Sequence, residues 1–599
     1  MPWTINTDPL GNIYLSACLA SLSIIYLFWA LAYKRMKGHW AALSALSLTV
    51  LISIIGFGMP VKLSLLATLD GSMYGLWPIA WIVITSIFLF NLSVQTGQFE
   101  IIKNSLASMV DDRRIQALLI AFSFGAFIEG CAGFGTPVAI TAAVLMGLGF
   151  KPIYAAGICL LANTAPVAFG AIGIPILVAG QVSGIETMAI SKMVGRTLPF
   201  ISVILPFYVV ILISGWKKGL EVWPAALVSG GSFALSQWFT SNYIGPMLPD
   251  IISAIVSIIC LGTFLRFWQP KNTWKFDHEA VARGKAELMY TGGQVFRAWA
   301  PFIILSIFVG AWGGFQQVKS ALDSFSLIPV TIPGLHNMVI RDGAAMAAIY
   351  SFNILSAGGT AILLTGLFSI PVMGASFSKG LNVFWYTIKS MQWPIVTISS
   401  ILGFAYLMNY SGMAITLGIA FATTGVFFPF FAAYLGWLGV FMTGSDTSSN
   451  ALFGKLQEVT ATQIGVDPVV TVAANSSGGV CGKMISPQSL AVATAAVGLV
   501  GRESEIFRFT VKHSIILTTV IGIMAYLQAY VITWIVPVYQ KGVAVAAAAA
   551  QPVSHAIGFT YLAITIGLVL CIAIISRVFG KSKGTEAGAE IAVLPTPTE

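Results

Sequence analysis

The sequence predicts an all-α polytopic membrane protein, built as inverted repeats with about 13 transmembrane helices, two re-entrant hairpins and two broken helices. Apolar residues make up 57% of the 599 residues and charged residues only 9%, whereas a soluble domain has roughly 25% charged residues. Apolar runs of about 20 residues, enough to cross a hydrocarbon core of ~30 Å, follow one another along the chain. The net charge of +9 is spread between these runs and forms no patch, which argues against nucleic-acid binding.

The runs that we expect to span the membrane lie near residues 13–33, 40–59, 73–95, 152–180, 196–214, 220–239, 248–267, 294–315, 343–375, 391–408, 466–500, 514–535 and 556–577. Two further runs, 115–150 and 428–460, are broken at Glu129–Pro137 and at Thr443–Asn450. We expect each to form a hairpin that enters and leaves on one side of the membrane. Segment 96–114 is amphipathic and fits a helix along the interface, whereas 410–427 is apolar enough to cross.

The distribution of Lys and Arg predicts the orientation of these spans. The proposed cytoplasmic segments hold far more basic residues than the external ones, so the positive-inside rule places the N-terminus outside and the C-terminus in the cytoplasm. No basic region precedes the first apolar run, which argues against a cleaved signal peptide. The first hairpin would then enter from the cytoplasm and the second from outside, so the repeats would be inverted.

We expect six parts along the chain. They are N-terminal scaffold helices (1–95), a transport element with a hairpin and a broken helix (96–180), central scaffold helices with a cytoplasmic loop at 269–292 (196–408), a second transport element of the same kind (410–500), C-terminal helices (514–577) and a disordered cytoplasmic tail (578–599). The alanine-rich segment 540–555 is expected to be a surface linker. Three features of the first transport element recur in the same order in the second: Thr96-Gly97, Glu129 and Ala162-Asn163-Thr164 correspond to Ser411-Gly412, Asp446 and Ala474-Asn475-Ser476.

The two acidic residues at the hairpin breaks are candidates for proton coupling. A carboxylate near the membrane midplane costs roughly 2.5–3.5 kcal/mol on insertion scales, so Glu129 and Asp446 are expected to face the protein interior and to serve function. A carboxylate in such an environment can bind and release a proton near neutral pH. The alternative is a fixed structural pair with a buried base.

Small polar residues and one lysine interrupt the last apolar helices. Lys483 needs a counter-charge, which could be a substrate carboxylate, Asp446 or Glu129; structural pairing or snorkelling to the interface is the alternative. The breaks at Asn163, Thr164 and near Ser445 offer hydrogen-bonding groups and free backbone to a ligand. The remaining candidate binding residues form one string in the second half: Asn475, Ser476, Ser477, Gly478 and Gly479. No nucleotide, metal or zinc spacing appears, so neither a cofactor nor a metal is expected, and the chain is not expected to be an enzyme.

At these motifs the chain resembles the bacterial L-lactate permease family. The resemblance lies in Gly75–Ala80, Gly125–Pro137, Gly149–Pro152, Ala162–Gln181, Gly436–Phe453, Ala473–Gln488 and Phe507–His513. It implies a proton-coupled symporter of the bacterial inner membrane, for L-lactate, D-lactate and glycolate. Through a wider superfamily of ion transporters, it also implies a scaffold with an elevator-like transport domain.

We therefore expect the 2-hydroxy acid to bind between the hairpin tips and the broken helices. Its carboxylate would meet Lys483 and the amides of Ser476–Gly479, and its hydroxyl would meet Asn163, Thr164 or Asn475. Sodium coupling is an alternative, because Asn-, Ser- and Thr-rich breaks can also hold Na⁺. A second alternative is a proton-translocating subunit of a membrane enzyme, which would have soluble partners and bind no small acid.

Overall fold

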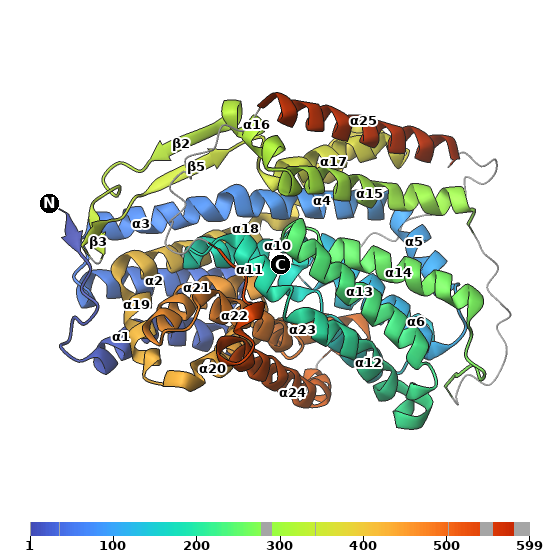
Figure 1. Cartoon of the computed structure of the whole chain (residues 1–599), viewed down its shortest axis with the longest axis horizontal. Helices are drawn as coiled ribbons and strands as arrows, with labels where there is room; N and C mark the ends of the chain where they lie inside the picture. The colour runs from blue at the N-terminus through green and yellow to red at the C-terminus, as the bar shows by residue number, and fades with distance from the viewer. Residues whose placement is uncertain are drawn as a thin grey trace.

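The long helices run side by side along the longest dimension of the molecule, and two small sheets lie at one end (Figure 1). The computed structural model describes residues 2–34, 36–133, 135–276, 290–341, 343–500, 502–539 and 555–579. The expected linker 540–555 and the expected tail 578–599 therefore lie almost wholly outside the described residues, as does most of the loop 269–292.

Eleven described helices are long and apolar enough to cross a membrane, or twelve if the bent pair Pro152–Ala162 and Val167–Ser183 is one span. The prediction of a helical, multi-pass membrane protein is thus confirmed. The count of about 13 crossings and the re-entrant path of the hairpins stay predictions.

The first half of the chain holds α1 (Ile13–Phe28), α2 (Gly38–Leu51), α3 (Val61–Tyr74), α4 (Trp81–Gln95), α5 (Gln98–Ala107), α6 (Arg113–Ala117), the π-helical segment η4 (Leu118–Phe124), α7 (Gly125–Cys131), α8 (Thr136–Gly147), α9 (Pro152–Ala162), α10 (Gly170–Ser183), α11 (Thr187–Val194), α12 (Leu198–Leu220), α13 (Trp223–Tyr243) and α14 (Pro249–Phe267). The second half holds α15 (Gly292–Gly314), α16 (Gln316–Ser326), α17 (Gly358–Val372), α18 (Phe377–Ser411), α19 (Met413–Ala422), α20 (Phe428–Thr443), α21 (Asp446–Gln463), α22 (Pro468–Lys483), α23 (Pro487–Ala496), α24 (Glu503–Tyr530) and α25 (His555–Phe579).

The run 73–95 is longer and more irregular than predicted. Its helix begins at Val61, and the backbone leaves helical geometry at Trp77 (φ −140°, ψ 125°), directly before Pro78. Proline lacks an N–H donor and disfavours helical geometry in the residue before it, which explains the interruption.

The run 343–375 is not one helix, which corrects the prediction. It contains β4 (Ala344–Ala345) and β5 (Ile349–Asn353) before α17. β5 pairs antiparallel with β2 (Leu327–Thr331), with Leu327 opposite Asn353, while β3 (Val339–Arg341) lies between β1 (Trp3–Thr4) and β4. Ile349, Tyr350 and Phe352 are β-formers, and a count of apolar residues alone does not separate a strand from a helix.

Segment 410–427 is too short to cross the membrane as one helix. Its helix α19 has 10 residues, about 15 Å at 1.5 Å per residue, which is half of a hydrocarbon core. The preceding helix α18 has 35 residues and extends for about 52 Å.

The two halves repeat the same order of elements. A left-handed glycine, Gly97 or Gly412, starts the short helices α5 and α19. A helix pair follows, with left-handed Gly135 or Gly444 at its turn, and then an interrupted helix, α9–α10 or α22–α23. Only glycine adopts such a conformation without a steric penalty, so glycine occupies each of these turn positions in the sequence.

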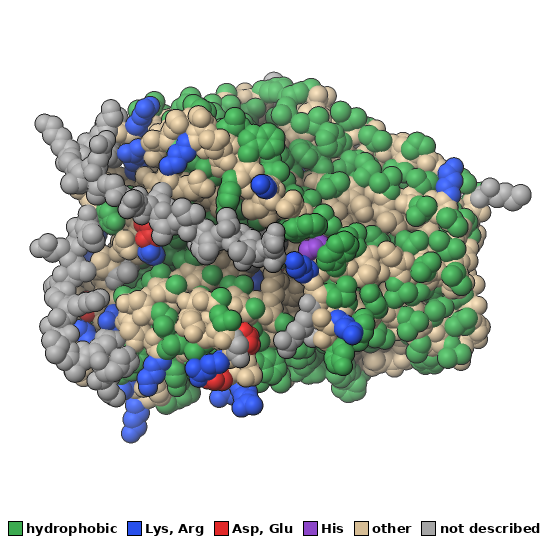
Figure 2. Space-filling view, turned by 180° about the vertical axis from the view of Figure 1, so that it is seen from behind, with side chains coloured by type: hydrophobic (Ala, Val, Ile, Leu, Met, Phe, Trp, Pro, Cys, Tyr) green, Lys and Arg blue, Asp and Glu red, His purple; other side chains and the backbone are tan. Residues whose placement is uncertain are grey.

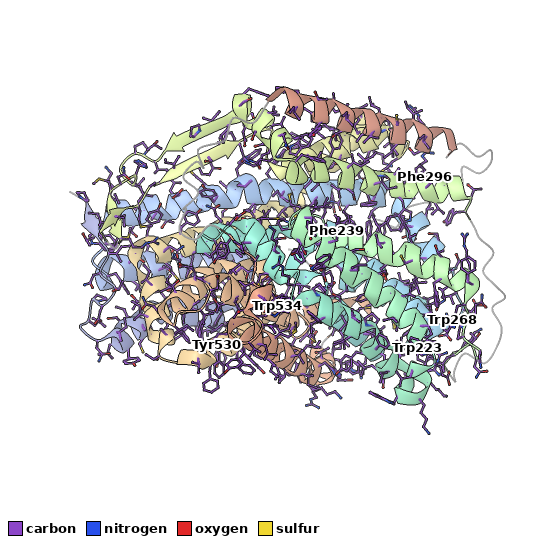
Figure 3. All side chains as sticks on the ribbon, viewed as in Figure 1. Trp223, Phe239, Trp268, Phe296, Tyr530 and Trp534 are labelled. Carbon is purple, nitrogen blue, oxygen red and sulfur yellow. The ribbon has the colours of Figure 1, made fainter. Side chains whose placement is uncertain are left out.

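The surface agrees with a membrane setting. Figure 2 shows hydrophobic side chains over much of one face, with the visible Lys and Arg side chains mainly toward its left end. Trp223 begins α13 and Trp268 follows α14, so these neighbouring helices place both indoles near one end (Figure 3). Such a position is typical of aromatic side chains at a membrane interface.

Candidate substrate and proton site

Glu129 lies in the interior of the molecule on α7, the first arm of the predicted hairpin. Every residue from 114 to 131 is buried, and Glu129 itself is 2% exposed. A Cβ atom on Gly170 would lie 2.6 Å from Oε1 of Glu129. The glycine therefore leaves the space that the carboxylate occupies.

Lys483, the last residue of α22, pairs with Glu129 across the two halves of the chain. Its Nζ donates to Oε1 of Glu129 at 2.6 Å, and Nδ2 of Asn163 donates to the other carboxylate oxygen at 3.0 Å. The side chains of Glu129 and Lys483 are 3% and 9% exposed. These three predicted site residues form one cluster. Of the three counter-charges considered for Lys483, the structure shows Glu129.

Asn163 occupies its place because α9 ends there. It is the C-terminal cap of α9, and the next helical segment is bent away by 63°. Beyond the bend, Ala171 and Ile172 have the positive φ angles of 45° and 57°, a strained geometry for residues with side chains that is typical of functional segments. Oδ1 of Asn163 and Oγ1 of Thr164 are buried without a partner among the described residues.

Asp446, the first residue of α21, forms a second cluster. Its Oδ2 accepts from Oγ of Ser476 at 2.6 Å and from Nδ2 of Asn450 at 3.3 Å. A Cβ atom on Gly479 would lie 2.3 Å from Oδ1 of Asp446. That oxygen is buried and has no partner within the described ranges.

Asn450 and Gln457 complete this second cluster, and neither was among the predicted binding residues. Asn450 Oδ1 accepts from Nδ2 of Asn475 at 2.9 Å, and Oδ1 of Asn475 accepts from Gln457 at 3.1 Å. Asn450 also donates to the carbonyl of Pro175, on the broken helix of the other half, at 3.1 Å. Asp446, Asn450 and Gln457 recur at helical spacing on one face of α21, and this spacing is the signal that could have identified them.

The string 475–479 does not break its helix, contrary to the prediction. α22 is continuous from Pro468 to Lys483, and the break follows at 484–486. Gly478 serves close packing instead, since its Cβ would lie 2.1 Å from the carbonyl oxygen of Ala433 on α20. Backbone amides inside a helix are already hydrogen-bonded, so those of residues 476–479 are not free for a substrate.

Two other predicted residues have different surroundings. Oγ of Ser477 is buried and unpaired within the part of the chain that the structure describes. Ser445 caps α21 by accepting from the backbone N–H of Ser448 at 3.3 Å. Ser477 thus keeps a free hydroxyl that can face a ligand, whereas the hydroxyl of Ser445 is engaged in a cap.

The two clusters act on each other electrostatically. Asp446 interacts with Lys483 and with Glu129 through space. Lys483 makes its ion pair with Glu129, and its charge also acts on Asp446, so it is a cation for which an incoming anion can compete. The arrangement can exchange one carboxylate partner of Lys483 for another, provided that the displaced carboxylate becomes neutral.

Comparison with known proteins identifies the family. The model of the L-lactate permease family matches residues 16–532. The chain belongs to the L-lactate permease family. Members of this family are transporters, so the chain is not an enzyme and is a multi-pass membrane protein.

The relatives match this family member over almost their whole length. The glycolate permease GlcA of Escherichia coli (strain K12) is 53% identical over 89% of this chain and 99% of its own. The L-lactate permease of Bacillus subtilis (strain 168) is 51% identical over 90% of this chain and 100% of its own.

Among solved structures, Neisseria gonorrhoeae MtrF is 13% identical and covers 77% of this chain and 83% of its own, with a TM-score of 0.41. The Alcanivorax borkumensis YdaH transporter is 14% identical over 78% of this chain and 88% of its own, also with a TM-score of 0.41.

Proposed function

We propose that this permease imports L-lactate, D-lactate and glycolate across the bacterial inner membrane by symport with a proton. The family and the names of the relatives support the substrate class. The observation that carries the mechanism is the buried Glu129–Lys483 pair, which joins the two halves of the chain at 2.6 Å. As predicted from the distribution of charge, the N-terminus would lie outside and the C-terminus in the cytoplasm.

The substrate carboxylate would replace Glu129 as the partner of Lys483. If Glu129 takes up a proton in the same step, one anion and one proton enter together and the net charge of the buried site is unchanged. The unpaired atoms Oδ1 of Asn163 and Oγ1 of Thr164 can then accept from, or donate to, the 2-hydroxyl group. An acid without that hydroxyl would leave them unpaired, which explains a preference for 2-hydroxy acids.

Asp446 would be the second protonatable group of the site. Its unpaired Oδ1 and the unpaired hydroxyl of Ser477 offer a further position for a proton or for part of the substrate. The elements 96–180 and 410–500 would move together as the transport domain against the scaffold helices 1–95, 196–408 and 514–577, because the contact Asn450–Pro175 and the Glu129–Lys483 pair tie them to each other.

Uptake into proteoliposomes tests this proposal. Labelled L-lactate should accumulate under an inward proton gradient, and a protonophore should abolish the accumulation. Excess D-lactate and glycolate should compete, whereas acetate should not. Effective competition by acetate would contradict a role for the 2-hydroxyl group.

Sodium coupling is the alternative that the site geometry also permits, because the unpaired oxygens of Asp446 and Ser477 are hard ligands. The same uptake at fixed pH, with and without an inward sodium gradient, separates the two. Accumulation that follows sodium and survives the protonophore would contradict proton coupling.

A further inference from the structure

Asp250 is a buried carboxylate beside the Glu129–Lys483 pair, and it was not among the predicted site residues. It lies in the first turn of α14 and is 1% exposed. Neither of its carboxylate oxygens has a hydrogen-bond partner among the residues that the structure describes. One turn later, Oγ of Ser253 is also buried without a hydrogen-bond partner among the described residues.

The backbone next to Glu129 contacts Asp250 directly. A Cβ atom on Gly130 would lie 2.8 Å from Cβ of Asp250, so α14 approaches α7 at the residue after Glu129. Through space, Asp250 interacts with Glu129 and Lys483.

Among the described residues, the elements that pack most closely against α14 bring Asp250 no counter-charge. Helices α7, α13 and α10 and the segment η4 contact α14. Of their side chains, α10 and η4 contribute no titratable group, and on α13 the only one is Tyr243, which is 62% exposed. Lys483 is already engaged with Glu129.

The two neighbouring carboxyl groups are therefore in opposite situations. Glu129 has an ammonium and an amide donor, and so it can stay ionised in the interior. Asp250 has no donor among the described residues, and an apolar interior strongly disfavours an ionised carboxylate without donors. In this arrangement Asp250 is the carboxyl group that holds a proton.

We propose that Asp250 is the proton donor to Glu129 during substrate loading. This inference rests on the proposed function. When the substrate carboxylate takes Lys483, the O–H bond of Asp250 breaks and a new O–H bond forms on the Glu129 oxygen that Lys483 has released. Asp250 then regains a proton from water on the side from which the substrate came, so one proton is bound for each substrate anion. Its place in the first turn of α14 stabilises the transient carboxylate, because the positive end of the helix dipole lies there.

Transport by Asp250→Asn tests the donor role. The amide is isosteric but has no acidic proton, so the initial rate of proton-driven L-lactate uptake is expected to fall at least tenfold. The final accumulation ratio should be retained, because Glu129 can still be protonated slowly from water. Asp250→Glu should recover part of the rate. Asp70→Asn is the matched control and should leave the rate unchanged. Asp70 is also a buried carboxylate with one unpaired oxygen among the described residues, and its other oxygen accepts from the hydroxyl of Tyr410 on α18.

Each other outcome overturns the donor role. A wild-type rate in Asp250→Asn shows that no proton passes through Asp250. Lost accumulation with intact lactate exchange shows that Asp250 is the carrier of the proton instead of its donor. If wild-type protein itself fails to accumulate lactate, the proposed function has failed as well. If Asp250→Asn does not fold, infrared spectra of wild-type protein with ¹³C-labelled aspartate decide: no band of a protonated aspartic acid, or a band unaffected by lactate, overturns the proposal.

Discussion

Replacement of Lys483 by methionine tests the centre of the proposed site. Methionine retains much of the volume of the lysine stem but removes the ammonium group that donates to Glu129 at 2.6 Å. A hydrogen bond to a charged group contributes about 1.5–3 kcal/mol. At about 1.4 kcal/mol per factor of ten, lactate should bind about 10- to 100-fold more weakly to Lys483→Met.

The same change should destabilise the fold, because Glu129 loses its counter-charge. Removing one partner of a buried ion pair costs about 3–5 kcal/mol when the other stays ionised. The double variant Glu129→Gln/Lys483→Met has no unpaired charge, so it should recover most of that stability while still failing to bind lactate. In the double variant, stability should therefore recover although lactate binding does not.

Binding is measured by calorimetry on the purified permease, and stability by thermal unfolding. Lys455→Met is a matched control, because Lys455 is also a nearly buried lysine, and it pairs with Glu458 on its own helix. It should leave lactate affinity unchanged. Affinity of Lys483→Met within threefold of the wild-type value would refute the assignment of Lys483 as the ligand of the substrate carboxylate.

Three further changes test other parts of the site and fold. Glu129→Gln should abolish proton-driven accumulation, so that labelled lactate only equilibrates across the membrane, whereas lactate exchange should be retained. Uptake under a proton gradient measures the first and counterflow measures the second; unchanged accumulation would show that Glu129 does not couple transport to protons. Gly170→Ala should separate Glu129 from Lys483, because its Cβ would lie 2.6 Å from Oε1, and overpacking of this kind costs about 1–3 kcal/mol, visible as a lower Tm. Arg114→Ala should destabilise by about 3–5 kcal/mol, because wholly buried Arg114 pairs with Asp112 at 2.7 Å; a Tm unchanged from wild type would show that this pair adds no stability.

The sequence predicted those parts of the fold that composition and turn chemistry control. Apolar runs predicted most of the long helices. The repeat was predicted from three short motifs, one of which contains Gly97 and Gly412, the left-handed glycines before α5 and α19. The strands Leu327–Thr331 and Ile349–Asn353 were missed. They pair with each other across the segment 332–348, and a hydropathy pattern contains no information on such a pairing.

For the site, the sequence identified the charged residues but not their partners. A carboxylate and a lysine inside apolar runs are rare enough to be recognised singly. Asp250 escaped notice because it lies near the start of an apolar run, where an acidic residue normally reaches the interface. Gly478 and Gly479 suggested a broken helix, yet they allow α20 and Asp446 to approach α22 closely. Both uses of glycine leave the same sequence pattern, and only the packing separates them.

The unequal partners of the carboxyl groups follow from where each half of the chain breaks. In the first half α9 ends at Asn163, so the amide turns toward Glu129; in the second half α22 continues to Lys483, and a cation at a helix C-terminus is stabilised by the helix dipole. A symmetric pair of breaks would have placed an amide opposite each carboxylate and a lysine opposite neither. Because the two halves differ at this point, the site contains, among the described residues, one ammonium group for several carboxyl groups. In the proposed mechanism, a site with fewer cations than acids binds one proton with each anion that it admits, and this deficit would couple lactate to protons.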